Sequence, residues 1–453
     1  MGGLKPSPTI FRAYDVRGVY GKDIDEEIAY GIGRAFGVMV SGNVLVGRDV
    51  RRSGEKLVNA LADGLTDSGV DVLIGGVCTT PACYFGGRFF KTAGGVMVTA
   101  SHNPPEWNGF KMFLANGETV SQDAGMEKIR EMVINQQYGP RPPTKGRVEN
   151  VDLNKFYVNH LVEKFPSLEG VKMAADMSDG SACLVYPQIA EKLKIKATLL
   201  NDNPDGYFRG HSPEPTEENI SALKKTVVEH KLDFGVAFDG DADRAVFVDD
   251  KGRTLEGDMA LAVVLKALEK KGLVIYDVNS STALKEVAER HGFQTLEWKV
   301  GRAFIHRKVR ELGAVIGGEK SNHLYFGELA GDDDAIYASL KMAQIIHSSK
   351  KPLSEHVDEI PKYPTTPIIV FDCPDETKFE AVDKIAKELE GLGMKVSRLD
   401  GVKAYSENGW ILVRASNTMP QIKMSAEAKD VESLKKLKEL GERLIKQATT
   451  SRL

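Results

Sequence analysis

Short apolar runs alternate with amphipathic stretches along most of the chain, and the same order recurs three times. The segments NVLVGRDVRRSG, VKMAADMSDGSA and LVIYDVNSSTA each predict an apolar strand that ends near an aspartate, namely Asp49, Asp176 and Asp277. Apolar positions then follow at helical spacing in EKLVNALADGL, ACLVYPQIAEKL and LKEVAERHG. A strand, a loop and an amphipathic helix in this order are typical of α/β domains, so the pattern predicts three such domains in tandem.

Each predicted unit also contains a second apolar strand that leads into a polar loop and back into a strand. The three segments are GGVMVTASHNPPEWNGFKMFL, DFGVAFDGDADRAVFV and GAVIGGEKSNHLYFG. The identity between these repeats is too weak to prove duplication. Because open α/β sheets bind ligands at strand ends, we expect the three polar loops to carry the chemistry.

The last part of the chain departs from this order. It contains strands in TPIIVFDCP, KVSRL and GWILVRAS, a helix over about 378–390 and a final helix VESLKKLKELGERLIKQA, which together predict a smaller α+β domain. The stretch from Pro361 to Pro367 predicts a hinge before it. The expected fold is three tandem similar α/β domains with mixed sheets, followed by a smaller α+β C-terminal domain. We expect the boundaries at 1–149, 150–250, 251–362 and 363–453.

The composition is that of an ordered globular protein. Among 453 residues, 42% are hydrophobic and 27% charged, and 60 basic against 64 acidic residues give a net charge of -4. No run of lysine and arginine is interleaved with aromatic residues, which argues against a nucleic-acid partner. No apolar stretch is long enough for a membrane span, the N-terminus lacks a signal core, and the four cysteines form no CxxC pair. We therefore expect a cytoplasmic protein with no membrane partner.

The segment DGDADR places Asp239, Asp241 and Asp243 between two apolar strands. Carboxylates this close repel one another unless a divalent cation or basic groups compensate, and hard oxygen ligands suit Mg²⁺. A calcium EF-hand is excluded because its sixth position is Arg244 instead of glycine and its twelfth is Asp250 instead of glutamate. A solvated acidic turn is the alternative to a metal site.

Three further loops carry side chains whose types alone leave their role open. In TASHNPPEWNGFK, the neighbours Ser101 and His102 do not by themselves make a hydrolase dyad, because catalytic partners meet in space and no G-x-S-x-G turn surrounds the serine. GGEKSNH offers an acid, a hydroxyl and an imidazole that suit a polyol. RASNTMP combines a guanidinium, two hydroxyls and an amide, which are donors that hold a phosphate dianion. An ordinary turn at a strand end is the alternative for each loop.

Two other polar stretches favour structural roles. In GDDDAIYASLKMA, either Asp333 or Asp334 is expected to cap the following helix. In GRDVRRSG, we expect a turn between strand and helix in which Arg48 pairs with Asp49.

Together and in this order, the loops resemble those of the α-D-phosphohexomutase superfamily, and the resemblance covers essentially the whole chain. TASHNP is similar to the phosphoserine loop of the first domain, DGDADR to the metal loop of the second, GEKSNH to the sugar-recognition loop of the third, and RASNTMP to the phosphate-binding loop of the fourth. The start, FRAYDVRG, is similar to the phosphomannomutase/phosphoglucomutase branch. The resemblance implies an enzyme that interconverts the 1- and 6-phosphates of mannose or glucose. Its reaction would pass through a phosphoserine and a hexose 1,6-bisphosphate, which also serves as activator.

The resemblance also implies a role for each site residue. Ser101 would carry the phosphoryl group and contact Mg²⁺, with Asp239, Asp241 and Asp243 as the metal's carboxylate ligands. The other implied catalytic residues are His102, which orients the serine loop, Lys111 and Arg17, which manage protons or charge, and Arg244, which helps to neutralise the phosphate. The implied substrate-binding residues are Gly301, Arg302, Glu319, Ser321, His323, Arg414, Ser416, Asn417 and Thr418.

Three positions depart from the family's pattern. Asn322 stands where the sugar-recognition loop usually has glycine, which predicts a different backbone path. Met419 replaces a glutamate common in the phosphate-binding loop, and Asn279 stands where some relatives carry a lysine.

Other functions are weighed against this interpretation. A phosphoglucosamine mutase is the nearest alternative. A phosphatase of the haloacid dehalogenase type would use Asp239 as its nucleophile, and a regulator would bind sugar phosphates without turnover. Hexose phosphates are the expected partners, and the sequence leaves a homo-oligomer open.

Overall fold

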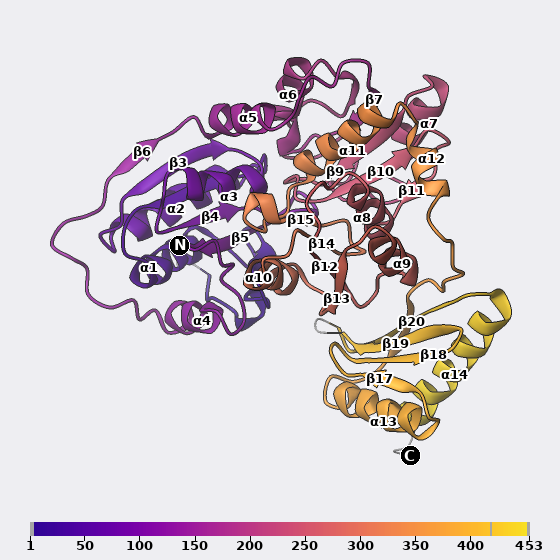
Figure 1. The fold of residues 1–453 in the computed structure, drawn as a ribbon. Helices are drawn as coiled ribbons and strands as arrows, with labels where there is room; N and C mark the ends of the chain where they lie inside the picture. Colours follow the sequence, from indigo (N-terminus) through magenta and orange to yellow (C-terminus); the bar gives the residue numbers. More distant parts are fainter. Residues whose placement is uncertain (1–3, 417–418, 451–453) are drawn as a thin grey trace.

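The computed structural model describes residues 4–416 and 419–450, which form four sheets in succession along the chain (Figure 1). The first sheet is mixed and has the strand order β1-β5-β4-β2-β3-β6. Its parallel pairs are β2/β4, β2/β3 and β3/β6, whereas β5 runs antiparallel to β4 and β1. Its elements are η1 (Pro8–Ile10), β1 (Val16–Val19), α1 (Glu26–Met39), β2 (Val44–Arg48), α2 (Gly54–Thr66), β3 (Val72–Val77), α3 (Thr80–Phe89), β4 (Gly94–Val98), β5 (Trp107–Leu114), α4 (Met126–Asn135) and β6 (Val148–Asn150).

The second sheet has the order β11-β10-β9-β7-β8, with β7 parallel to both β8 and β9, and β10 antiparallel to both β9 and β11. Its elements are α5 (Leu153–Glu163), β7 (Lys172–Asp176), η2 (Ser181–Leu184), α6 (Tyr186–Lys192), β8 (Lys196–Leu200), α7 (Ser221–Glu229), β9 (Phe234–Phe238), β10 (Ala245–Asp249) and β11 (Thr254–Leu255).

The third sheet has the order β13-β12-β14-β15, in which β12 is parallel to β13 and β14, and β15 is antiparallel to β14. Its elements are α8 (Gly257–Leu265), β12 (Leu273–Asp277), α9 (Thr282–Arg290), β13 (Gln294–Trp298), α10 (Arg302–Leu312), β14 (Ile316–Gly318), β15 (Leu324–Phe326), η3 (Gly327–Leu329), α11 (Ala335–Ser349) and α12 (Leu353–Asp358).

The fourth sheet is antiparallel throughout, with the order β16-β20-β19-β18-β17. Its elements are β16 (Ile369–Asp372), α13 (Lys378–Gly391), β17 (Lys395–Ser397), β18 (Val402–Ser406), β19 (Gly409–Ala415), β20 (Gln421–Ala428) and α14 (Val431–Thr450). The predicted fold, three tandem α/β domains with mixed sheets and a smaller α+β domain, is confirmed.

One predicted helix is wrong in its extent. The segment ACLVYPQIAEKL forms the short helix η2 and then α6, and Val185 between them has a non-helical φ of -127°. Pro187 lies in the first turn of α6. Because proline lacks an N–H and disfavours helical geometry in the residue before it, a helix begins readily at this point but does not run through it.

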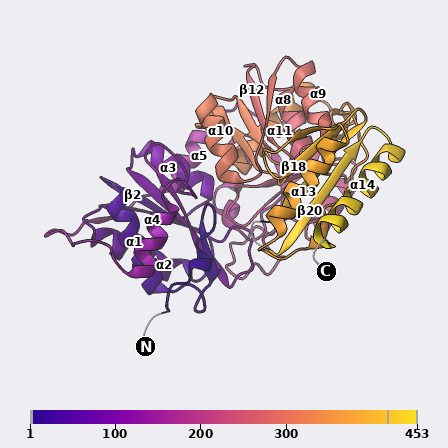
Figure 2. The same cartoon turned by 90° about the horizontal axis from the view of Figure 1, so that it is seen from below.

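One hydrophobic cluster extends over the first three domains, the first domain has a second cluster of its own, and the fourth domain has a separate cluster. One buried cluster includes Leu45 of β2, Phe234 of β9 and Val274 of β12, and α11 of the third domain packs against β9 and β10 of the second. The fourth domain's cluster lies between its sheet and the helices α13 and α14. Figure 2 shows the first and fourth domains at opposite ends of the molecule.

The sheets bring the polar loops of the first three domains to the ends of buried strands. The loops join the antiparallel pairs β4–β5, β9–β10 and β14–β15, and β4 and β9 are buried at every position. Within residues 4–416 and 419–450, no helix has both the length and the apolar character needed to cross a membrane.

Candidate active site

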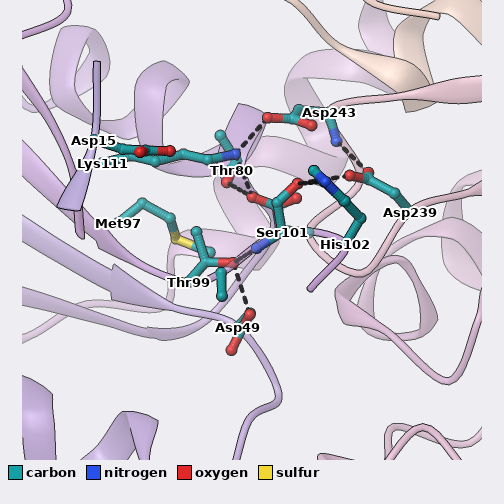
Figure 3. Close-up of polar contacts among 12 residues, drawn as sticks. Asp15, Asp49, Thr80, Met97, Thr99, Ser101, His102, Lys111, Asp239 and Asp243 are labelled. Atoms are coloured by element: carbon teal, nitrogen blue, oxygen red, sulfur yellow. Dashed lines mark hydrogen bonds and ion pairs between the residues drawn. The ribbon is translucent and has the colours of Figure 1, made fainter. Parts of the chain in front are cut away.

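Ser101 lies in the loop after β4 in a backbone conformation that non-glycine residues rarely adopt. Its φ is 52°, in the left-handed region, and its side chain is almost fully buried. Its N–H donates to Thr99 Oγ1 at 2.8 Å, and its hydroxyl donates to Asp239 Oδ2 at 2.8 Å (Figure 3). His102 Nδ1 lies 3.3 Å from the same hydroxyl. The first domain thus presents Ser101 directly to the acidic loop of the second.

Asp239, Asp241 and Asp243 are all buried in the loop between β9 and β10. Each offers a carboxylate oxygen, and these oxygens lie within 4.8 Å of one another. Among the residues that the structure describes, Oδ1 of Asp241 and Oδ1 of Asp243 have no hydrogen-bond partner. Burial, with the neighbouring charges of Asp243 and Asp241, raises the pKa of Asp239 to about 7. Hard oxygen ligands in this arrangement fit a divalent cation such as Mg²⁺.

Lys111 projects from β5 into this acidic cluster. Its Nζ donates to Asp241 Oδ2 at 2.7 Å and to Asp243 Oδ2 at 2.6 Å. Burial alone would lower the pKa of Lys111, but the two carboxylates outweigh it and raise the pKa. Lys111 is therefore held as an ammonium in this structure, where it compensates negative charge.

Two arginines complete the charges around the serine loop. Arg17 on β1 donates through Nη1 to Asn103 Oδ1 at 2.6 Å, and its Nε donates to Asp15 Oδ2 at 2.8 Å. Arg244 donates through Nε to Asp239 Oδ2 at 3.2 Å. Its buried Nη2 has no hydrogen-bond partner among the described residues. This guanidinium therefore keeps a donor available beside the Ser101 hydroxyl.

The loop between β14 and β15 carries Glu319, Ser321 and His323. Glu319 is buried, and its carboxylate accepts from the Gly301 backbone N–H at 2.8 Å and from the Tyr325 hydroxyl. Asn322 has a φ of 73°, so it adopts the left-handed conformation that glycine favours and that asparagine tolerates better than most residues. Asparagine therefore keeps the positive φ that a glycine could adopt here. This removes the reason for expecting a different backbone path at position 322.

Asp333 holds two of the predicted substrate-binding residues in place. It accepts from Arg302 Nε at 2.7 Å and Nη2 at 2.6 Å, and it lies 2.8 Å from His323 Nδ1. The helix cap predicted for Asp333 or Asp334 belongs to Asp334, which accepts from the Tyr337 N–H at 2.8 Å. Asp333 instead contacts Arg302 and His323.

A cavity of about 240 Å³ joins the first and third domains at this point. Ser101 and the serine-loop residues form one side, and the Glu319 loop with Gly301 and Arg302 forms the other. Tyr14 and Asp15 also line it, although the sequence patterns predicted no role for them. Their position beside Arg17 in FRAYDVRG was the only signal that could have found them. The lining residues from the predicted site are Arg17, Ser101, His102, Lys111, Asp243, Gly301, Arg302, Glu319, Ser321 and His323.

Arg414 and Ser416, the two predicted phosphate-binding residues that the structure describes, do not line this cavity. Arg414 at the end of β19 forms an ion pair with Asp400 at 2.9 Å, and Asp400 also accepts from the N–H of Val300, which lines the cavity. Ser416 is buried, and its hydroxyl accepts from the Met419 N–H at 3.2 Å. Asn417 and Thr418 lie outside the described residues.

The predicted pairing of Arg48 with Asp49 is wrong. The Asp49 carboxylate binds Arg51 Nε at 2.9 Å, whereas the Arg48 side chain donates to the Asp49 backbone carbonyl. Arg48 is the last residue of β2, and the ion pair with the buried carboxylate is made by Arg51 after the turn.

Comparison with known proteins assigns the fold and the loops to one family. Four models of the phosphoglucomutase/phosphomannomutase family match the chain: alpha/beta/alpha domain I over residues 8–139, domain II over 155–252, domain III over 256–363 and the C-terminal domain over 369–440. The chain belongs to the phosphoglucomutase/phosphomannomutase family. The resemblance to the α-D-phosphohexomutase superfamily is thereby confirmed.

Relatives within this family are similar over nearly their whole length. A phosphoglucomutase/phosphomannomutase from Thermococcus kodakarensis is 34% identical, covering 97% of this chain and 99% of its own. A probable phosphoglucosamine mutase from Methanosarcina acetivorans is also 34% identical, with the same coverage of both chains. The crystal structure of a phosphoglucomutase/phosphomannomutase family protein from Burkholderia thailandensis superimposes with a TM-score of 0.91 at 30% identity and covers 98% of each chain.

Proposed function

We propose that this chain is a Mg²⁺-dependent phosphohexomutase that moves a phosphoryl group between C1 and C6 of glucose or mannose phosphates. The observation that carries the proposal is the position of Ser101. Its hydroxyl touches Asp239 of the three-carboxylate cluster, and the residue lines a cavity whose other side is the Glu319 loop. A serine in an ordinary polar turn would need neither the buried carboxylates nor the facing cavity.

The proposed reaction transfers one phosphoryl group without releasing it to water. The bond between phosphorus and Ser101 Oγ breaks as the free hydroxyl of the bound hexose phosphate forms a new P–O bond. The proton of that hydroxyl passes to a basic group, and the serine oxygen regains a proton. The resulting hexose 1,6-bisphosphate turns around, and its other phosphoryl group returns to Ser101 by the reverse step. Atoms and charge therefore balance over the cycle.

Positive charge around Ser101 supports this transfer. The transferring group spreads negative charge over its oxygens, so catalysis depends on positioning and on cations held nearby. Arg244 and Lys111 supply fixed positive charges beside Ser101. Arg17 donates a hydrogen bond to Asn103 in the serine loop. We propose that His102 orients the hydroxyl, which lies 3.3 Å from its Nδ1.

The metal fits the same residues. A phosphate on Ser101 would bring its negative charge beside the buried carboxylate of Asp239, which is unfavourable without a compensating cation. We propose that Ser101, Asp239, Asp241 and Asp243 hold Mg²⁺, which would stabilise charge on the transferring group. The unpartnered oxygens of Asp241 and Asp243 support this set.

We propose that the sugar is recognised by the third domain and its distal phosphate by the fourth. Glucose and mannose differ at C2, so a sugar that binds in both orientations is best held by its 3- and 4-hydroxyls, for which Glu319 and Ser321 are the contacts. Arg302 and His323 line the same cavity. Arg414, Ser416, Asn417 and Thr418 would bind the non-reacting phosphate.

A phosphatase with Asp239 as nucleophile has less support. Both carboxylate oxygens of Asp239 are occupied by contacts from Ser101, Asp243 and Arg244, and the residue is fully buried. Ser101, by contrast, lines the cavity.

A coupled assay tests the proposal directly. It compares the 1-phosphates of mannose, glucose and glucosamine with trace hexose 1,6-bisphosphate present. Turnover of mannose and glucose phosphates that exceeds turnover of glucosamine phosphate supports the proposal, and the reverse order favours a phosphoglucosamine mutase. Release of inorganic phosphate would favour a phosphatase, and binding without isomerisation would favour a regulator. The four domain boundaries, cytoplasmic localisation and a homo-oligomer stay predictions.

A further inference from the structure

Arg51, which follows β2, is a fully buried arginine that holds the serine loop by its backbone. Its Nη2 donates to the carbonyl of Ser101 at 2.9 Å and to that of Asn103. Its Nη1 donates to the carbonyls of Trp107, at 3.0 Å, and Pro104. One side chain with no exposed surface therefore contacts four carbonyls between residues 101 and 107.

The same network holds the other backbone polar group of Ser101. Asp49 accepts from Arg51 Nε at 2.9 Å and from the Thr99 hydroxyl at 2.7 Å. The Thr99 hydroxyl oxygen in turn accepts from the Ser101 N–H at 2.8 Å. Both the N–H and the C=O of Ser101 are thus fixed by groups that lead back to one buried ion pair.

This fixation matches the strained backbone of Ser101. A serine with φ of 52° lies in a sparsely populated region, and such a conformation persists only when the surroundings impose it. The backbone conformation at this residue sets the direction of its Cα–Cβ bond and so limits where its Oγ can point. In this structure, Oγ points at Asp239 and the side chain faces the cavity.

The second domain covers the guanidinium and closes the space around it. The ring of Phe208 lies over Arg51, with 5.0 Å between the guanidinium carbon and the ring centroid. Gly240 of the acidic loop packs against the Ser101 carbonyl so closely that a Cβ there would lie 2.7 Å from the oxygen. Arg51 therefore lies where the serine loop meets the acidic loop.

We infer that Arg51 is a positioning residue for phosphoryl transfer, which sets the direction of the Ser101 side chain through the loop backbone. This inference rests on the proposed function, because it assumes that Ser101 carries the transferred group. Arg51 belongs neither to the lining of the cavity nor to the three-carboxylate cluster. Its effect belongs to the transfer step, and substrate affinity is set by the other side of the cavity.

Arg51→Lys tests the inference, because lysine keeps the charge and the ion pair with Asp49 but cannot reach four carbonyls with one planar fork. A small misplacement of a reacting group costs up to about 100-fold in rate, so kcat should fall by about 10- to 100-fold. KM for glucose 1-phosphate should change by less than about threefold.

Arg34→Lys is the matched control. Arg34 on α1 is also a buried arginine of the first domain, and it donates to Ser68 Oγ at 3.0 Å and to the Gly139 carbonyl at 3.2 Å, away from the serine loop. We expect its loss of melting temperature to be similar to that of Arg51→Lys, with kcat near that of the unsubstituted protein.

Thr99→Val provides a second variant if Arg51→Lys does not fold, since it removes the acceptor of the Ser101 N–H and leaves every charge in place.

Single-turnover measurements separate this inference from the proposed function. Enzyme labelled with ³²P on Ser101 is mixed with glucose 6-phosphate, and transfer to the sugar should be slowed in Arg51→Lys but not in Arg34→Lys. Unchanged transfer in folded Arg51→Lys, or in Thr99→Val if the first variant does not fold, would overturn the inference. Equal slowing in Arg34→Lys would also overturn it, by assigning the effect to stability. Failure of the unsubstituted protein to accept label or to isomerise sugar phosphates would instead contradict the proposed function.

Discussion

At the scale of residues, the site is a balance of buried charges. Three aspartates without compensation would be costly to bury, and Lys111 offsets two of them through contacts of 2.7 and 2.6 Å. Asp239 keeps a pKa of about 7 because burial and its acidic neighbours disfavour its ionised form. A divalent cation would relieve the same repulsion, so metal binding and the ionisation of Asp239 favour each other.

Asp241→Asn should remove most of the mutase activity and weaken Mg²⁺ binding. Asp241 Oδ1 has no partner among the described residues, and its carboxylate belongs to the proposed ligand set. Substitution of a residue that only supports a metal ligand typically lowers metal affinity or activity by about 10- to 100-fold. Loss of a ligand should therefore lower them by at least as much. Activity as a function of Mg²⁺, together with calorimetric titration of Mg²⁺, checks this.

Asp176→Asn is the matched control, since Asp176 is a buried carboxylate at the end of β7 whose contacts are Ser178, Asn201 and His211. Its Mg²⁺ titration should resemble that of the unsubstituted protein. Full activity of the unsubstituted protein in metal-free buffer would contradict the metal site.

At the scale of elements, the sequence predicted the strands and loops that have a recognisable pattern of apolar and polar side chains. The apolar runs of β4 and β9 are buried at every position, as expected for strands inside a sheet covered on both faces, so their positions followed from the sequence. The network of Arg51 was not predictable, because its loop partners are backbone carbonyls, which any residue supplies. The pairing of Arg302 with Asp333 joins positions 31 apart and depends on how α10 packs against the loop before α11.

The N-terminus of α11 gives a pH-dependent contribution to stability. Asp334 caps this helix and accepts from the Tyr157 hydroxyl at 2.9 Å, and burial raises its pKa to about 7 from an ordinary value of 3.8. A carboxyl group with a raised pKa binds its proton more tightly in the folded state. Its contribution to stability is therefore fully present below about pH 4 and is lost as the pH rises towards 7.

Asp334→Asn does not titrate, so its melting temperature relative to that of the unsubstituted protein should increase between pH 5 and pH 8. Thermal unfolding at several pH values measures this difference. Asp430→Asn is the control, because Asp430 has a lowered pKa and stays ionised from pH 5 to pH 8, so its melting-temperature difference should be constant over that range. The pKa of Asp430 is lowered by the Ser433 N–H, so this residue stabilises above the unfolded pKa and loses that effect as the pH falls. If the melting-temperature difference between Asp334→Asn and the unsubstituted protein did not change with pH, the raised pKa of Asp334 would be contradicted.

At the scale of the whole molecule, the first three domains contribute to one buried cluster, and the fourth domain has its own cluster and contacts the third. Its contacts with the third domain include the packing of Trp410 on Val278 and the bond from Lys403 Nζ to the Val278 carbonyl at 2.8 Å. Pro364 and Thr366 already bond to β20, so the second half of the predicted hinge stays with the fourth domain. We propose that rotation occurs before Pro364, which would let the phosphate-binding loop approach and leave the cavity.

The sequence did not predict the position of the fourth domain, and the reason is physical. The position of the fourth domain depends on contacts such as that between Asp400 and the Val300 N–H, which lie 100 residues apart and involve a backbone donor. The loop RASNTMP indicated phosphate chemistry from its donors, but no pattern in the sequence indicated that Arg414 would pair with Asp400 in this structure.

Arg414→Ala should weaken kcat/KM by about 10- to more than 100-fold for glucose and mannose phosphates alike. A charge-assisted contact of this kind contributes about 1.5 to 3 kcal/mol, and both sugars present the same phosphate. Steady-state kinetics with each sugar measures the effect. Arg398→Ala is the control, because Arg398 is an exposed arginine of the same domain that pairs only with Glu390 and Asp383 among the contacts described. Unchanged kcat/KM in folded Arg414→Ala would rule out binding of the non-reacting phosphate by Arg414.

The most direct test of the whole mechanism follows the phosphoryl group itself. The protein is incubated with ³²P-labelled hexose 1,6-bisphosphate, the labelled peptide is identified by mass spectrometry, and unlabelled glucose 6-phosphate is then added. We expect label on Ser101 that moves into sugar phosphate at least as fast as turnover, with neither label nor turnover in Ser101→Ala. Label on another residue, turnover without label on Ser101, or near-native activity in Ser101→Ala would contradict the proposed mechanism.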